Sequence, residues 1–445
     1  MNVNPITRLD YPDLDVIRVE DTYYMVSTTM HFMPGCEILQ SFDLVHWEHV
    51  TYVYETLDHT DAQQLKSGQN IYGQGMWAAS LRYHEGRFCI CFVANDTRKT
   101  YLYTSEKIDG PWKKQLIEGF YHDGSLLFDE DGRNYIVYGN DEIWITELNE
   151  DLTAPKKDGL HRLLVSDHKN PELGYEGSHI QKINGYYYIF LIHSLRDRWM
   201  RTEACFYSDS LEGEFTGGDV LCDDRGYCGQ GVAQGGIVDT PDGKWYAMLF
   251  QDSGAVGRIP ILLPVTWKDH FPFFGQNGHV PEEIEVHSTR PGYIYQPLVG
   301  SDDFCNGLLP RWQFNHDPDP RYYHLDALQG TYTITTREVC TELTQAVNTL
   351  TQRMSYPSCA AEVTVDASAL KEGDVAGLCA LQSCYAAVGI TKHHGKYEVL
   401  MLDKKEDGIL DMTEGTVVES HQMDFRLEAD FCNMKDEAHC YYRVN

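Results

Sequence analysis

The sequence predicts an all-β protein, with a five-bladed β-propeller over residues 1–295 followed by a jelly-roll-like β-sandwich over residues 300–445. One strand–turn–strand pattern recurs five times in the first part, at intervals of 45 to 65 residues. After about residue 295 the pattern stops and plain alternating strands follow. Repeats of short antiparallel strands at this spacing are typical of propeller blades, because a single blade cannot bury both of its faces.

Each repeat begins with a polar or small residue and continues with an apolar strand, a turn and an aromatic strand. In the fourth repeat, Asn184-Gly185 is a hairpin turn signal and the run 186–192 predicts a buried strand. The five repeats are "DLDVIRVEDTYYMVSTT" from Asp13, "AASLRYHEGRFCICFVAND" from Ala78, "DGSLLFDEDGRNYIVYGND" from Asp123, "EGSHIQKINGYYYIFLIH" from Glu176 and "QGGIVDTPDGKWYAMLFQD" from Gln234.

A second element, a Ser followed by an apolar and then an aromatic residue, closes several repeats. It reads "SFDLVHW" at 41–47, "SEKIDGPW" at 105–112 and "SDSLEGEF" at 208–215. The later segments lack both elements and predict a sandwich: "LQGTYTITT", "CAAEVTVDAS", "VAGLCALQS", "AAVGITKHHGKYEVLML" and "MDFRLEADF".

The composition limits the kinds of partner and the cellular compartment that we expect for this protein. Lys plus Arg total 36 and Asp plus Glu total 67, a net charge of −31, which disfavours nucleic acid and anionic membrane surfaces and suits a neutral sugar or peptide. The N-terminus shows no signal peptide, and no apolar run approaches the ~20 residues of a membrane span. The 13 Cys include no C-x-x-C pair, so we expect reduced thiols, no zinc site and a cytoplasmic location.

The repeats place five residues at one equivalent position, the start of the strand that lines the central channel: Asp13, Ala78, Asp123, Glu176 and Gln234. Three of these residues are carboxylates, which would repel one another and push their pKa values apart, and such strain is typical of functional sites. A turn-capping role is the alternative for each Asp alone. Capping would predict Asp in every repeat, so the mixture of Asp, Glu, Ala and Gln favours function.

A channel mouth with carboxylates and aromatic residues, on a protein that repels anions, suits glycoside hydrolysis. In that chemistry one carboxylic acid protonates the leaving oxygen, and one carboxylate activates water on the opposite face of the sugar. A third carboxylate can tune the acid. The sequence therefore predicts a hydrolase with its site at the channel mouth.

The same segments resemble glycoside hydrolase family 43, of the β-xylosidase and α-L-arabinofuranosidase type. The resemblance rests on "NPITRLDYPDLDVIRVEDTYYMVSTTMHFMPG", "MWAASLRYHEGRF", "HDGSLLFDEDGRNY" and "YEGSHIQKINGYYY". It extends through "LLPRWQFNHDPDPRYYHL" and "NTLTQRM", which resemble the sandwich domain of those enzymes. It implies an exo-acting, inverting hydrolase that releases single pentoses, β-D-xylose or α-L-arabinofuranose, from non-reducing ends of cell-wall oligosaccharides.

The resemblance also implies roles for individual residues. Asp13 falls on the general base, Glu176 on the general acid, and Asp123 on the carboxylate that tunes the acid and orients the substrate. Small residues after Glu176 are expected to leave room for the sugar. Four further residues fall on substrate-binding positions: Arg258, Trp77, Phe32 and Gln234, with blade core as the alternative for both aromatics.

Three departures from the family pattern qualify this assignment. Leu14 and Ala79 stand where Pro is common, and Gln234 stands where many members have a His that faces a channel metal. We therefore expect no required cofactor and no metal ligand; a structural calcium held by waters is the alternative. The sandwich is expected to be shorter than in relatives.

A non-catalytic sugar-binding propeller with the same pocket is the competing interpretation, and a scaffold for protein partners is a second. The three carboxylates favour an enzyme over both. The sequence leaves open the choice between xyloside and arabinofuranoside, and whether the protein forms a homo-oligomer.

Overall fold

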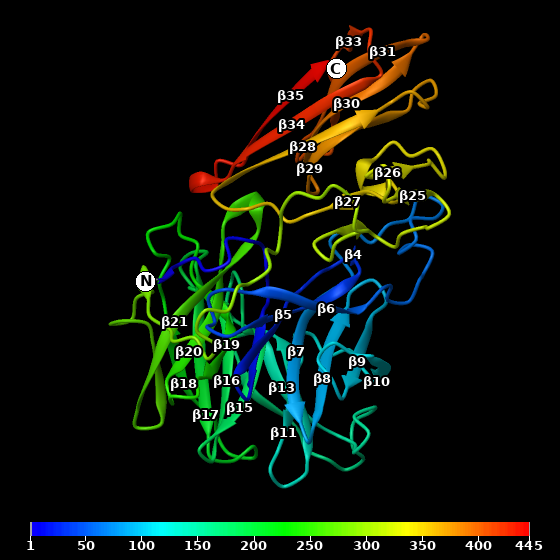
Figure 1. Ribbon diagram of the computed structural model, residues 1–445. Coiled ribbons are helices and arrows are strands. Elements are labelled where there is room, and N and C mark those ends of the chain that lie inside the picture. The colour runs from blue at the N-terminus through cyan, green and yellow to red at the C-terminus, as the bar shows by residue number, and fades with distance from the viewer. Residues whose placement is uncertain (1, 445) are drawn as a thin grey trace. The chain divides into compact units, whose positions relative to one another are not determined.

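The computed structural model describes residues 2–444, and the all-β prediction is confirmed (Figure 1). The helical elements among these residues are three short 3₁₀ turns, η1 (Gly254–Val256), η2 (Leu343–Gln345) and η3 (Cys432–Met434). None of these turns has the length or apolar character to span a bilayer. The chain contacts divide into two compact units, Met1–Asp252 with Arg258–Arg353, and Ser253–Gly257 with Met354–Asn445.

The first unit contains five four-stranded antiparallel sheets in chain order, the blades of the predicted propeller. Blade 1 has β2 (Asp15–Val19), β3 (Thr22–Val26), β5 (Gly35–Ser41) and β6 (Glu48–Tyr54). Blade 2 has β7 (Met76–His84), β8 (Arg87–Ala94), β9 (Lys99–Ser105) and β10 (Lys113–Ile117). Blade 3 has β11 (Ser125–Phe128), β12 (Asn134–Asn140), β13 (Glu142–Leu148) and β14 (His161–Ser166). Blade 4 has β15 (Glu176–Ile183), β16 (Tyr186–Ser194), β17 (Arg201–Ser208) and β18 (Thr216–Leu221), and blade 5 has β19 (Ala233–Asp239), β20 (Trp245–Asp252), β21 (Arg258–Lys268) and β22 (Phe271–Phe274).

The hydrophobic core of the propeller lies between neighbouring blades rather than within them. Five apolar clusters join blades 1 and 2, 2 and 3, 3 and 4, 4 and 5, and 5 and 1. The second strand of each blade is therefore covered on both faces, as in β16, whose residues after Tyr186 are all buried. This explains why the aromatic and β-branched runs predicted buried strands.

The N-terminal segment closes the ring against blade 5. β1 (Asn2–Val3) pairs with β23 (Glu283–Ile284), and the backbone N–H groups of Ile6 and Tyr11 donate to the carbonyls of Pro260 and Arg258. The Asn4 side chain also bonds both backbone groups of Leu262, at 2.7 and 3.0 Å. The ends of the ring are thus held by hydrogen bonds that replace an interblade β-ladder.

A buried ion-pair cluster lies on the propeller axis. The Arg82 guanidinium donates to Asp15 Oδ2 at 2.6 Å, to Ser125 Oγ at 2.7 Å and to the carbonyls of Leu126 and Ile180. Asp15 also contacts His179 Nδ1 at 3.2 Å. Burial by itself would raise the pKa of Asp15, but Arg82 and His179 lower it to about 2. One cation therefore joins the inner strands of four blades.

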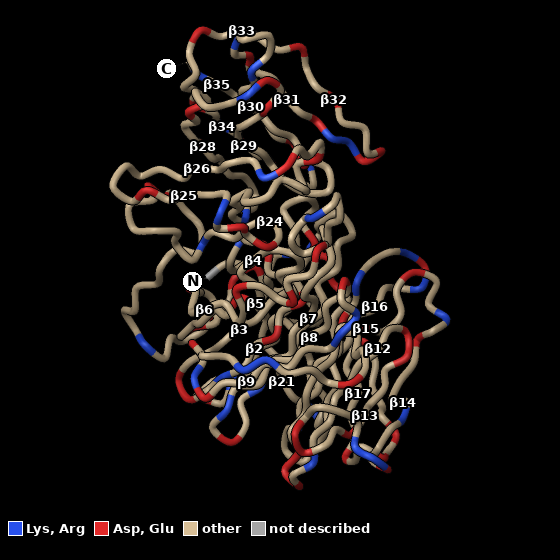
Figure 2. The backbone as a smooth tube through the Cα atoms, turned by 90° about the vertical axis from the view of Figure 1, so that its right-hand side faces the viewer, with Lys and Arg blue, Asp and Glu red and all other residues tan. Residues whose placement is uncertain are grey.

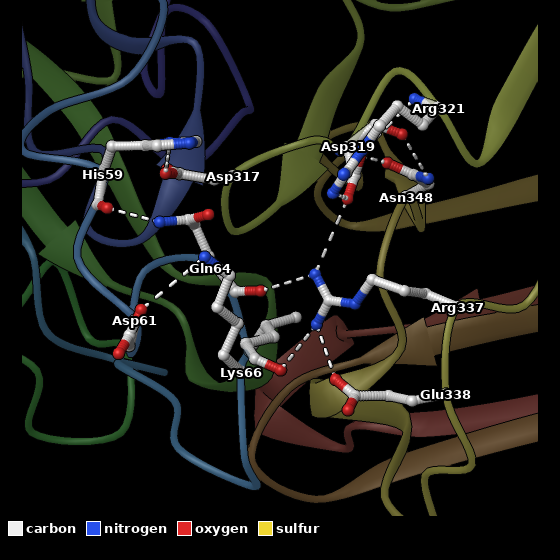
Figure 3. A network of polar contacts seen from close by, with 11 residues as sticks. His59, Asp61, Gln64, Lys66, Asp317, Asp319, Arg321, Arg337, Glu338 and Asn348 are labelled. Atoms are coloured by element: carbon white, nitrogen blue, oxygen red, sulfur yellow. Dashed lines mark hydrogen bonds and ion pairs between the residues drawn. The ribbon is translucent and has the colours of Figure 1, made fainter.

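Residues 300–353, which we name the strap, group with the propeller, although the sequence placed the domain boundary at 295–300. Strap strand β24 (Gln313–Asn315) lies between β4 (Phe32–Met33) and β27 (Leu350–Thr351), while β25 (Tyr323–Asp326) and β26 (Thr331–Ile334) form a hairpin. In the polar network of Figure 3, Arg337 donates to the carbonyls of Gln64 and Leu65. Asp317 contacts His59 at 2.7 Å, and the Gln345 side chain donates to the Gly68 carbonyl, so the strap holds the loop between β6 and β7 at several points.

The second unit is the predicted sandwich. One sheet contains β28 (Ser358–Asp366), β34 (Gln422–Asp430) and β35 (Glu437–Val444). The other contains β29 (Val375–Leu381), β30 (Tyr385–His393), β31 (Lys396–Lys404), β32 (Leu410–Met412) and β33 (Thr416–Val418). Their facing side chains form one core around Ile390, Met423 and Phe425.

The charged residues and the cysteines are spread over the whole chain. Figure 2 shows acidic segments on the strands and loops of both units, with basic segments interspersed among them. All 13 cysteines are free thiols, four of them buried in the propeller: Cys36, Cys89, Cys91 and Cys205.

We predict that Arg82→Met strongly destabilises the propeller. The substitution leaves the buried Asp15 carboxylate without its main cation, and breaking a buried pair in this way typically costs about 3–5 kcal/mol. Thermal unfolding of the variant should therefore show a clearly lower midpoint. Arg133→Met, which breaks an exposed pair with Asp131, is the matched control and should leave the midpoint nearly unchanged. Equal, small shifts in both variants would contradict the axial role of Arg82.

Candidate active site

The first strand of every blade carries the same one-residue bulge at the channel mouth. We call the residue just before the bulge in each blade the flanking residue. Each flanking residue still pairs with the second strand or with the segment that follows that strand: Pro12, Trp77, His122, Glu176 and Ala233. The next residue in each blade, the bulge residue, has a positive φ, from 37° at Ala78 to 65° at Gly177: Asp13, Ala78, Asp123, Gly177 and Gln234. Non-glycine residues in this conformation are strained, and such strain clusters at functional sites.

This register corrects one part of the sequence alignment. The sequence placed Glu176 at the position of Asp13 and Asp123, but Gly177 is the bulge residue of blade 4. Glu176 is a flanking residue, equivalent to Trp77 and His122. The alignment matched carboxylates and could not detect the bulge. Consequently Glu176 leaves the backbone at a different position from the two aspartates.

Asp13 is held on both sides of its carboxylate. Thr28 Oγ1 donates to Oδ2 at 2.7 Å, and the Arg258 guanidinium donates to Oδ1 at 2.7 Å. Thr28 in turn accepts the backbone N–H of Ala78 in blade 2. The predicted pocket arginine is therefore a direct partner of the predicted base.

Asp123 and Glu176 lie together on the other side of the mouth. Asp123 Oδ2 accepts the backbone N–H of Gly177 at 3.0 Å, and Glu176 Oε2 accepts the side-chain N–H of Asn140 at 2.7 Å. His122 Nε2 lies 3.6 Å from an oxygen of each carboxylate. Sequence reasoning missed Asn140 and His122, although His122 directly precedes Asp123 and Asn140 lies in the "GND" that ends the repeat from Asp123.

The electrostatics of this cluster follow from burial and proximity. Burial, together with the negative charges of Glu176 and Asp13, raises the pKa of Asp123 well above its usual value, while His122 opposes the rise. Burial by itself would lower the pKa of His122, but Glu176, Asp123 and Asp13 raise it. The two carboxylates therefore favour the protonated imidazole, and the imidazole in turn favours the ionised carboxylates.

Gly177 packs directly against the Gln234 side chain, and this contact explains why position 177 has no side chain. A Cβ at position 177 would lie 2.7 Å from Gln234 Cγ, and the φ of +65° also favours glycine. The small residue after Glu176 therefore makes room for Gln234, whereas the sequence suggested room for the sugar. Gln234 is buried, and its backbone N–H donates to Glu203 Oε2 at 2.7 Å.

The two predicted aromatic residues are connected through the loop between β6 and β7. Trp77 Nε1 donates to the Gly73 carbonyl at 3.2 Å, and the Gly73 N–H donates to His31 Nδ1 at 3.1 Å. The His31 ring packs on Phe32, with the centroids 4.3 Å apart. Phe32 lies in β4 beside the strap strand β24, whereas Trp77 is the blade 2 counterpart of Glu176.

A calcium ion in the axial channel is the metal that the sequence left as an alternative. Inner-strand residues of all five blades line an axial cavity of about 10 Å³, close to the size of one water molecule. Calcium takes roughly six to eight oxygen ligands. Asp13 is already paired with Arg258, and Asp15 with Arg82 and His179, so a hydrated calcium ion does not fit these residues.

The cluster of His122, Asp123 and Glu176 has donor atoms within 4.8 Å of one another, a spacing compatible with a metal ion. However, Gly177 and Asn140 already donate hydrogen bonds to the oxygens of Asp123 and Glu176. The raised pKa of His122 also favours its protonated form, which cannot ligate a metal through the protonated nitrogen. We interpret the cluster as an ion-pair group.

Separately held carboxylates at the mouth of a five-bladed propeller are the groups that glycoside hydrolysis requires, and comparison with known families places the chain in that class of enzyme. The chain belongs to glycosyl hydrolases family 43, whose sequence profile matches residues 3–272. Residues 301–445 match the profile described as "Beta xylosidase C-terminal Concanavalin A-like domain". The family resemblance and the propeller-plus-sandwich prediction are both confirmed.

Individual relatives agree with the family. The chain is 27% identical to the beta-xylosidase of Formosa agariphila, over 90% of this chain and 76% of that one. It is 27% identical to the xylosidase/arabinosidase 43B of Humicola insolens, over 86% and 74%. Among solved structures it is similar to a bifunctional GH43-CE protein of Bacteroides eggerthii, with a TM-score of 0.92 and 41% identity, and it spans 57% of that longer chain.

Glu203 lies in β17 of blade 4 and accepts the backbone N–H of Gln234, the bulge residue of blade 5. Its carboxyl therefore provides a test of the structure around that bulge. Burial raises the pKa of this carboxyl well above its usual value of about 4.5, which favours the protonated form in the folded protein. A raised folded-state pKa contributes stability that is present below pH 4.5 and is lost as the pH rises. Glu203→Gln, a neutral isostere, removes that loss. We expect the thermal midpoint of the variant to gain on the wild type between pH 4.5 and pH 7.5.

Glu85→Gln, an exposed substitution, should show no pH-dependent difference from the wild type. Glu203→Ala leaves the Gln234 N–H without an acceptor and should lower the midpoint at every pH, because an unsatisfied buried donor costs about 1–3 kcal/mol. A Gln variant that loses stability at high pH would show that Glu203 is ionised in the folded protein.

Proposed function

We propose that this glycoside hydrolase is exo-acting and inverting, and that it releases single pentoses from the non-reducing ends of neutral oligosaccharides. Asp13 acts as general base, Glu176 as general acid, and Asp123 tunes the acid and orients the sugar. The observation that carries the proposal is that Asp13 and Glu176 are held by different partners in different blades. Arg258 and Thr28 hold Asp13 in blade 1, while Asn140 and the blade 3 cluster hold Glu176.

In this mechanism Glu176 protonates the glycosidic oxygen as the bond from that oxygen to the anomeric carbon breaks. Asp13 accepts a proton from a water molecule, whose oxygen attacks the anomeric carbon from the opposite face. The product sugar carries the inverted configuration. The Arg258 guanidinium keeps the Asp13 carboxylate oriented toward that face, and no metal ion or cofactor takes part.

The substrate class is supported by the relatives. The matched proteins carry the names beta-xylosidase and xylosidase/arabinosidase, and both pentoses are neutral. The net charge of −31 disfavours anionic partners. Trp77, equivalent in register to Glu176, is the proposed wall of the sugar site, and Phe32 is proposed to extend that wall from β4. A sugar-binding role without turnover is disfavoured by three carboxylates held in distinct environments.

Glu176→Ala is expected to separate substrates by their leaving groups. Turnover of xylobiose should be lost, because its sugar leaving group needs a proton, whereas dinitrophenyl xyloside should keep most of its rate. Asp13→Ala should fail on both substrates, since water still needs its base. Steady-state rates on the two substrates provide the measurement. Equal losses from Glu176→Ala on both substrates would remove Glu176 from the role of acid.

The stereochemistry of the first product is the second test. Proton NMR during hydrolysis of a β-xyloside should show α-xylose before mutarotation. Initial β-xylose would indicate retention, with a nucleophilic carboxylate only ~5 Å from the acid. In that case Asp13 could not be a water-activating base.

A further inference from the structure

His122 occupies a particular place in the repeat. It is the flanking residue of blade 3, in the position that supplies Trp77 in blade 2 and Glu176 in blade 4. The repeat that delivers the acid to the mouth therefore delivers an imidazole beside it. His122 directly precedes Asp123, so the same turn presents both side chains to the mouth.

The contacts of His122 differ from those of a structural core histidine. Its side chain is 25% exposed, and its Nε2 lies at equal distances of 3.6 Å from Asp123 Oδ2 and Glu176 Oε2. These distances are too long for a settled hydrogen bond and short enough for strong attraction between charges. Asn140 already provides Glu176 with a neutral hydrogen bond, so the imidazole is not required for that purpose.

We propose that His122 is a positioning residue of the reaction, whose imidazolium holds the carboxyl of Glu176 against Asp123 and balances the negative charge that Glu176 gains when it gives up its proton. This inference rests on the proposed function and assigns to the same site a cation that assists the acid.

The charge balance of the mouth supports this role. Once Glu176 has donated its proton, three carboxylates converge, and the Arg258 guanidinium is paired directly with Asp13. The charged groups that act on His122 are Asp123 from its own turn, Glu176 from β15 and Asp13 from blade 1, and all three are acidic. Within residues 2–444, His122 is the basic group in ion-pair range of both Asp123 and Glu176.

Two substitutions separate charge from hydrogen bonding. His122→Gln keeps a neutral N–H donor near the position of Nε2, and His122→Phe removes both properties. His84→Gln, at a partly exposed histidine on the same propeller, is the control. Thermal unfolding identifies any variant that fails to fold, and the remaining variant then carries the test.

Rates on a series of aryl xylosides give the first measurement. We expect His122→Phe to lower kcat/KM for phenyl xyloside at least about tenfold more than for dinitrophenyl xyloside, with His122→Gln between it and the wild type. The basic limb of the pH profile should move to higher pH in both variants, because the cation beside the acid is gone. An equal loss for all leaving groups with an unmoved basic limb would overturn the proposal.

NMR titration of the histidine side chains gives a second measurement that needs no activity. The His122 imidazole should stay protonated at pH 7, because the neighbouring carboxylates raise its pKa. Glu176→Gln should bring the His122 titration to lower pH. A His122 that is neutral at pH 7 would overturn the inference, whereas absence of turnover on any pentoside, with His122 still protonated, would overturn only the proposed function.

Discussion

The convergence of five inner strands on one narrow axis governs the structure of this propeller. Every blade begins its first strand at this axis, where residues of all five blades line one small cavity, and each does so with the same bulge and a positive φ. The bulge interrupts pairing with the second strand and brings two consecutive residues of each blade to the mouth. Conformational strain at Asp13, Ala78, Asp123 and Gln234 is the cost of that geometry.

The same convergence concentrates charge, and the protein compensates it at two levels. Deep in the channel, Arg82 and His179 neutralise Asp15, and their bonds tie four blades together. At the mouth, Arg258 neutralises Asp13, and His122 lies between Asp123 and Glu176. At both levels a basic side chain lies beside a carboxylate from another blade. The two levels differ in how closely the carboxylates are paired: Asp15 has a direct ion pair, whereas Asp123 and Glu176 lie 3.6 Å from His122.

The strap extends the functional unit beyond the five blades. By pairing β24 with β4 and bonding the loop at residues 59–73, it holds the segment on which the Trp77 indole depends. His31 and His316 accept backbone N–H groups of this loop, and burial lowers the pKa of both rings, so they remain neutral acceptors. Residues 300–353 therefore belong structurally with the propeller, although the profile of the C-terminal domain begins at residue 301.

The sequence by itself determined the repeat and the strand-rich fold and pointed to Asp13, Asp123 and Glu176, because alternation, turn signals and repeated carboxylates are local properties of the chain, whereas Arg258 was predicted from the family resemblance. It could not determine that Gly177, rather than Glu176, is equivalent to Asp13, since a bulge changes register without changing composition. Nor could it select His122 and Asn140, whose importance depends on contact with a residue from the next blade. Only the tertiary structure, by closing the ring, brought these side chains within range of one another, because Coulomb interactions depend on distance in space and not on separation along the chain.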